Sequence, residues 1–165
     1  MSEAIVHPDG RFVFNGQMFA AVLGRGGVRA DKQEGDGATP VGLLKLRRVL
    51  YRADRVKLPQ TSVPREPIAP ADGWCDDIAS RDYNRPVQLP HPARHESLWR
   101  EDGVYDLIGV LGWNDAPVER SRGSAIFLHV MRPDRAPTEG CVALALPELQ
   151  AVLAAGLTGL RVLAA

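Results

Sequence analysis

A histidine and a cysteine flank one short polar loop near the end of the chain. His129 follows the apolar residues IFL, and Cys141 begins the apolar segment CVALAL, directly after Gly140. A cysteine attacks carbonyl carbon as the thiolate, and a neighbouring imidazole can accept the thiol proton. If folding brings the two strand ends together, they can form a thiolate–imidazolium pair. Gly140 lets the backbone approach a substrate closely, so the amides of Gly140 and Cys141 can face a developing oxyanion.

The same residues also have structural interpretations, which the sequence leaves open. A buried free cysteine is commonly a small core hydrophobe, and a histidine at a strand end is commonly a satisfied polar group. Zinc is disfavoured, because His129 and Cys141 stand 12 positions apart without a second ligand pair of the usual spacing. We therefore predict no metal and no cofactor. Cys75, in DGWCDD, is the weaker nucleophile, since nearby carboxylates oppose thiolate formation.

The elements that must position this pair are mostly strands. Two β-prone runs flank Asn15-Gly16, the dipeptide typical of a tight hairpin turn. One helix is predicted from Pro147 through ELQAVLAA, and Gly156 is its expected stop. This pattern indicates a mainly β protein, a β-sandwich or curled sheet with one helix after the cysteine. Further strands are predicted at 41–52, 105–113, 124–131, 141–146 and 160–165.

Residues 53–103 are rich in proline and weakly periodic, which indicates long irregular connections with short strands. Within them, His95 and Asn84 are polar residues among aromatic ones. Either can line a substrate groove, although hydrogen bonds that fix a loop are the favoured interpretation. The three tryptophans are expected in the core or in groove walls.

Composition limits the possible partners. The chain has 165 residues with 45% apolar and 24% charged content, which is typical of one soluble domain spanning 1–165. Basic and acidic residues balance at 20 each, so a nucleic-acid partner is not expected. No segment resembles a secretory signal or a membrane span, which predicts a cytoplasmic location, or a periplasmic one if a leader has been removed. The oligomeric state is not predicted.

The order His129, loop, Thr138-Glu139-Gly140-Cys141-Val142 resembles the signature of the YkuD-type L,D-transpeptidase catalytic domain. ATPVGLLKL, residues 38–46, resembles the upstream Thr-Pro-x-Gly strand of that family. The late helix with a short strand after it also fits, as do the elements DGWCDD, YNRPV, RHESLWR and PTEGCVAL of one branch. The resemblance covers nearly the whole chain, from about residue 10.

This resemblance implies cysteine acyl-enzyme chemistry on peptidoglycan stem peptides. Cys141 would attack the carbonyl between the L-centre of a diamino acid and the following D-alanine. His129 would act as base and then as acid, oriented by a third group that is often a backbone carbonyl. Thr138 would be a close neighbour of the reacting atoms.

The chain departs from the family pattern at two positions. Glu139 replaces the family's second histidine, and Ala143 replaces an arginine. A cation for a substrate carboxylate would then come from Arg132 or Arg135 in the loop, unless these arginines only solvate it.

Three functions follow as hypotheses. The favoured one is hydrolysis, an L,D-carboxypeptidase acting on soluble muropeptides during cell-wall recycling. The alternative reaction is transpeptidation, which passes the acyl group to an amine and cross-links peptidoglycan. A muropeptide-binding module without catalysis is the alternative from another class. A papain-like or caspase-like peptidase does not fit the order and spacing of His129 and Cys141.

Overall fold

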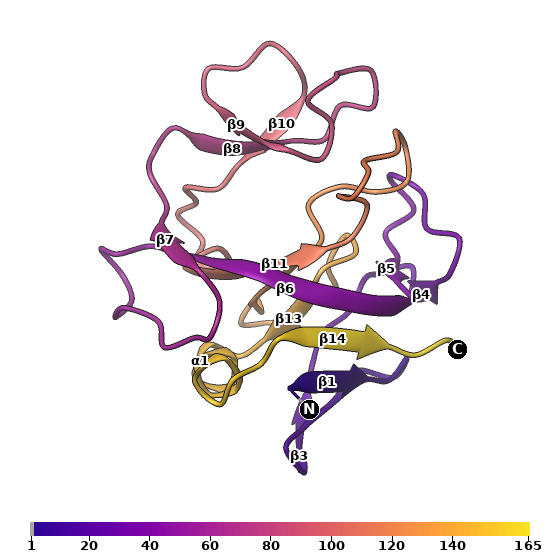
Figure 1. The fold of residues 1–165 in the computed structure, drawn as a ribbon, viewed down its shortest axis with the longest axis vertical. Helices are drawn as coiled ribbons and strands as arrows, with labels where there is room; N and C mark the ends of the chain where they lie inside the picture. Colours follow the sequence, from indigo (N-terminus) through magenta and orange to yellow (C-terminus); the bar gives the residue numbers. More distant parts are fainter. Residues whose placement is uncertain (1) are drawn as a thin grey trace.

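The computed structural model describes residues 2–165 and is mainly β, as predicted (Figure 1). Its main sheet has nine strands, and the short strand β7 (Arg65–Pro67) joins it only through β6. The other eight follow one another in the order β13 (Val142–Leu144), β12 (Phe127–Val130), β11 (Leu107–Gly112), β6 (Gly42–Tyr51), β14 (Gly159–Val162), β1 (Glu3–Val6), β2 (Arg11–Phe14) and β3 (Gln17–Ala20).

The sheet curls until its two ends meet. Beyond β3, the backbones of Val22 and Ala143 exchange two hydrogen bonds of 2.9 Å. The next residues continue this contact, because the amide of Arg25 donates to the carbonyl of Thr138 at 2.8 Å. The segment that leads into Cys141 is therefore held by the chain that follows β3 as well as by β12.

Local sequence accounts for the elements around this closure. Asn15 and Gly16 have φ of 50° and 74°, as a type I′ turn requires, so the predicted hairpin forms between β2 and β3. The single helix, α1 (Leu146–Ala154), has Pro147 in its first turn. It ends before Gly156, whose φ of 95° suits glycine. The strand and helix predictions in this part of the chain are confirmed.

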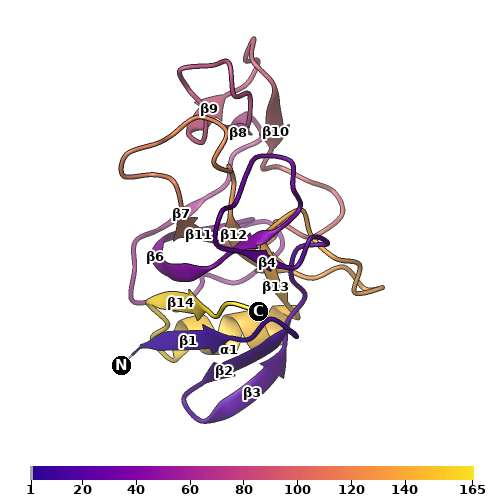
Figure 2. The same ribbon diagram turned by 90° about the vertical axis from the view of Figure 1, so that its right-hand side faces the viewer.

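Two hydrophobic clusters lie on opposite faces of the main sheet's central strands. The larger one packs α1 against the sheet through Leu149, Val152 and Leu153. The second contains Trp74, Phe127 and Cys141. Over it lies a small sheet with the order β10 (His95–Ser97), β8 (Asp72–Cys75), β9 (Pro86–Gln88), drawn at the top of Figures 1 and 2.

The proline-rich middle of the chain is thus more ordered than its weak periodicity indicates. It supplies β7 and the whole small sheet, and only its connections are irregular. A third sheet pairs β4 (Val28–Arg29) with β5 (Thr39–Pro40). Trp74 is buried in the second cluster, where Trp99 packs, and Trp113 packs against the first.

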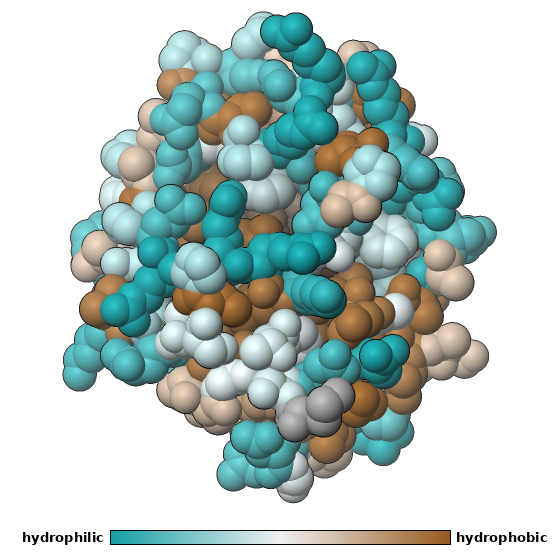
Figure 3. Space-filling model, viewed as in Figure 1, coloured by the Kyte–Doolittle hydropathy of each residue, from teal (hydrophilic) through white to brown (hydrophobic). Residues whose placement is uncertain are grey.

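The surface in Figure 3 is mostly hydrophilic, with apolar residues between the polar ones. Within residues 2–165, no helix has the length and apolar character that a membrane crossing needs.

Candidate active site

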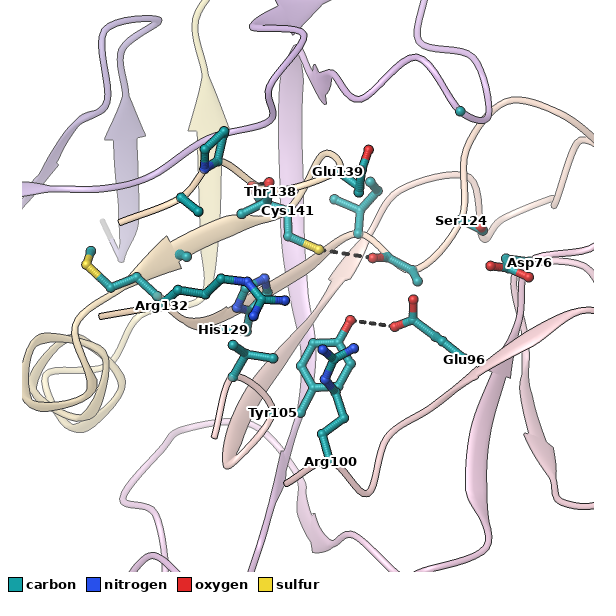
Figure 4. A pocket seen from close by; sticks show the side chains of 18 of the residues that line it. Asp76, Glu96, Arg100, Tyr105, Ser124, His129, Arg132, Thr138, Glu139 and Cys141 are labelled. Atoms are coloured by element: carbon teal, nitrogen blue, oxygen red, sulfur yellow. Dashed lines mark hydrogen bonds between the residues drawn. The ribbon is translucent and has the colours of Figure 1, made fainter. Parts of the chain in front are cut away.

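His129 and Cys141 lie on one face of two neighbouring parallel strands. The register pairs His129 with Ala143 and Leu128 with Val142, so Cys141, just ahead of β13, lies opposite Phe127. Strands about 4.8 Å apart that rise about 3.3 Å per residue place the Cα atoms of such a diagonal pair about 8 Å apart. Both side chains line one pocket of about 370 Å³ (Figure 4). The structure therefore brings together the two residues that the sequence singled out.

The turn before Cys141 requires its glycine. Gly140 has φ of 139°, and a Cβ there would lie 2.8 Å from the carbonyl oxygen of Ala38. The Thr138 hydroxyl donates to the carbonyl of Cys141 at 2.6 Å and accepts from the Gly140 amide at 3.1 Å. Thr138 thus holds the turn closed, and the Gly140 amide is occupied. Of the two amides expected at an oxyanion, only that of Cys141 has no partner within residues 2–165.

The neighbours of His129 determine its tautomer. Nδ1 lies 2.9 Å from the carbonyl oxygen of Val130. A carbonyl only accepts, so Nδ1 carries the hydrogen and Nε2 keeps a free lone pair. The ring of Tyr105 packs edge-on against the imidazole, with centroids 5.5 Å apart. The orienting group that the sequence could not choose is therefore the Val130 carbonyl.

Burial favours the uncharged form of both side chains. It lowers the pKa of His129 to about 4 and raises the pKa of the Cys141 thiol to about 12. The thiol donates to the carbonyl of Ala125, with Sγ 3.2 Å from the oxygen, and Sγ accepts from the Phe127 amide at 3.3 Å. Within residues 2–165, no hydrogen bond joins Sγ to His129. The resting pair is thus a neutral thiol and a neutral imidazole, rather than the thiolate–imidazolium pair that the sequence allowed.

A family model described as the L,D-transpeptidase catalytic domain, YkuD, matches residues 5–162. The chain belongs to the YkuD family. The resemblance seen in the sequence is confirmed over nearly the whole chain, and the mainly β fold agrees with it. The family assigns peptidoglycan chemistry to this domain. No curated protein matches the chain.

The pocket of this YkuD domain has further charged walls that sequence reasoning missed. The Tyr105 hydroxyl donates to the Glu96 carboxylate, and burial raises the pKa of both groups. Glu96 lies in RHESLWR, which resembled the family without indicating any chemistry. Glu96 reaches the pocket only because β10 pairs with β8 and because Tyr105 packs beside the Glu96 carboxylate. The other missed polar residues in the lining are Lys32, Glu34, Asp76, Arg100 and Ser124.

Two of the predicted substrate-binding residues line the pocket. Arg132 does so and pairs with Asp102, at 3.4 Å. Glu139, where the family has a histidine, also lines it and pairs with Arg25 at 2.8 Å. Both pairs involve exposed side chains and contribute little to stability.

The other three do not line the pocket. Arg135 contacts the sulfur of Met131 and the carbonyl of Ala20 instead. His95 bonds to the carbonyl of Ala93. Asn84, His95 and Arg135 therefore lie outside this pocket, contrary to the substrate contact that the sequence offered for each. For Asn84 and His95, the favoured interpretation was hydrogen bonds that fix a loop, and their contacts agree with it.

Asn84 is a buried structural residue. Its Oδ1 accepts from the Trp74 indole and from the Ala125 amide, both at 3.0 Å. Its Nδ2 donates to the carbonyls of Trp113 and Asn114. These contacts agree with the favoured interpretation of the sequence, in which hydrogen bonds of Asn84 fix a loop.

Cys75 is fully buried at the end of β8 and does not line the pocket. Within residues 2–165, no three His, Cys, Asp or Glu side chains are grouped to hold a metal ion.

Proposed function

We propose that this YkuD domain forms an acyl-enzyme on Cys141 from peptidoglycan stem peptides, cleaving between the L-centre of a diamino acid and the terminal D-alanine. The observation that supports this most directly is that Sγ of Cys141 and the free Nε2 side of His129 share one pocket. The family membership supplies the substrate class.

The neutral resting pair implies concerted chemistry. Nε2 of His129 accepts the thiol proton as Sγ leaves the Ala125 carbonyl and bonds to the substrate carbonyl carbon. The Cys141 amide donates to the developing oxyanion. Because burial lowers the pKa of His129, its imidazolium is a strong acid and readily protonates the departing D-alanine amine.

Water is the acceptor we propose for the acyl group, which makes the domain an L,D-carboxypeptidase on soluble muropeptides. The pocket volume of about 370 Å³ is near the lower end for ligand sites. Such a pocket suits one peptide and a water better than two peptides. Transpeptidation to an amine is the alternative outcome for the same acyl-enzyme.

The test is mass spectrometry of a disaccharide-tetrapeptide incubated with the protein, with and without a second peptide as amine acceptor. We expect loss of one D-alanine, abolished in Cys141→Ala and retained in Cys75→Ala, the control at the other cysteine. A cross-linked dimer as the main product would contradict hydrolysis. Equal activity in Cys141→Ala would contradict the nucleophile.

A second candidate is muropeptide binding without catalysis. It is favoured by the resting thiol, which is neutral and bonded to the Ala125 carbonyl. Calorimetry on the wild-type protein would then show peptide binding, while mass spectrometry would show neither product nor acyl adduct.

A further inference from the structure

Two arginines from separate loops flank the histidine side of the pocket. Arg100 precedes β11 and Arg132 follows β12, and both line the pocket with His129. Asp102 holds them together, because its Oδ2 accepts from both guanidinium groups. One carboxylate between two guanidiniums leaves a net positive charge at this wall. In Figure 4 the Arg132 guanidinium overlaps His129 in projection, and the Arg100 guanidinium lies over the Tyr105 ring.

Both arginines lie close enough to act on the histidine. Their charges add to burial in lowering the pKa of His129. The Arg100 guanidinium carbon lies 5.3 Å from the centre of the Tyr105 ring, which itself packs on His129. Neither guanidinium is fully buried, so both can contact a bound solute.

The far wall of the pocket carries the opposite charge. Glu34 and Asp76 line it, beside Lys32, whose ammonium pairs with Asp36 at 2.6 Å, and Figure 4 shows Asp76 across the pocket from Arg132. Glu96 lies nearer Arg100, bonded to the Tyr105 hydroxyl, and burial raises the pKa of its carboxyl. A bound anion is therefore repelled from that wall and attracted to the opposite one, formed by Arg100 and Arg132 and called the arginine wall below. Ala143, where the family has an arginine, also lines the pocket and supplies no charge of its own.

We propose that Arg100 and Arg132, held by Asp102, bind the C-terminal carboxylate of the residue released from the stem peptide. This inference rests on the proposed function, because His129 must face the leaving amine to protonate it. The carboxylate of that same residue is only two bonds further along and then reaches the arginine wall. A guanidinium matches a carboxylate in charge and in planar geometry.

The test compares two tetrapeptide substrates that differ only at the terminal D-alanine, one a free acid and the other a carboxamide. We expect kcat/KM to favour the acid by about ten- to a hundredfold in the wild type, as for hydrogen bonds between charged groups. In Arg132→Gln and in Arg100→Gln this preference should fall about tenfold or more. Arg135→Gln is the matched control from the same loop and should keep the wild-type preference, because Arg135 does not line the pocket.

General damage to the fold lowers the rates for the acid and the carboxamide alike. The ratio of the two kcat/KM values is therefore unaffected by such damage. Equal rates for acid and amide in the wild type, or an unchanged preference in both arginine variants, would overturn the inference while leaving the proposed function standing. If neither peptide is cleaved, the proposed function fails. Calorimetry of acid and amide binding to Cys141→Ala then tests the arginines alone, and absence of an acid preference there overturns the inference too.

Discussion

At the scale of single residues, burial determines how this cysteine can react. Cys141 and His129 are 9% and 8% exposed, and an uncharged thiol and imidazole are cheaper to bury than their ions. Many reactive cysteines are thiolates before substrate arrives. Here the proton would move only when substrate replaces the carbonyl of Ala125 as the partner of the thiol.

This state predicts the pH dependence of Cys141 alkylation in a Cys75→Ala background. Because burial raises the thiol pKa to about 12, the iodoacetamide rate should rise about tenfold per pH unit from pH 6 to pH 10. Peptide mapping by mass spectrometry follows the rate. A fast rate that is already constant above pH 5 would instead show a thiolate–imidazolium pair.

At the scale of elements, the turn between β12 and β13 places the sulfur. Thr138 closes the turn by two hydrogen bonds, and the chain after β3 holds Thr138 from the other side. Gly140 passes so close to the Ala38 carbonyl that no side chain fits. The turn is therefore fixed by contacts with segments that precede it by about a hundred residues in the chain.

Gly140→Ala should lower the free energy of unfolding by about 3 kcal/mol, from backbone strain and from the overlap with Ala38. Gly16→Ala is the matched control, since its φ of 74° is also positive but nothing lies near its Cβ position. Strain alone there should cost about 1 kcal/mol. Urea unfolding measures both values, and equal losses would refute the role of the close approach.

At the scale of the whole molecule, Asn84 connects the small sheet to the candidate active site. Its side chain takes part in four hydrogen bonds, and one of them holds the Ala125 amide. Ala125 has φ of 53°, an uncommon conformation for a residue with a side chain, and its carbonyl accepts from the thiol. The small sheet, which lies over the main sheet, thus helps to determine where the Cys141 thiol points.

Asn84→Ala should therefore destabilise the protein by about 3 kcal/mol, as buried polar partners lose their hydrogen bonds. Gln88→Ala, on the same small sheet, removes only an exposed bond to Asp72 and should cost less than about 0.5 kcal/mol. Thermal and urea unfolding compare the two. Similar small losses in the free energy of unfolding for both variants would show that Asn84 does not connect the small sheet to the main sheet.

The sequence by itself determined the hairpin at Asn15-Gly16, most strands of the main sheet and the single helix. These depend on neighbouring residues, through turn preferences, periodicity and the placement of proline and glycine. The motif around Cys141 was also readable, since His129, Thr138 and Gly140 lie close to it in the chain.

Only the tertiary structure decided how the pocket is charged. In the folded chain Arg132 lines the pocket and Arg135 does not, and Arg100 and Glu96 also line it. The Val130 carbonyl orients His129. Glu96 reaches the pocket because β10 pairs with β8 and Tyr105 packs beneath, contacts that local periodicity does not encode. The protonation of Cys141 and His129 depends on burial, which arises from the packing of distant segments and is therefore a property of the folded molecule alone.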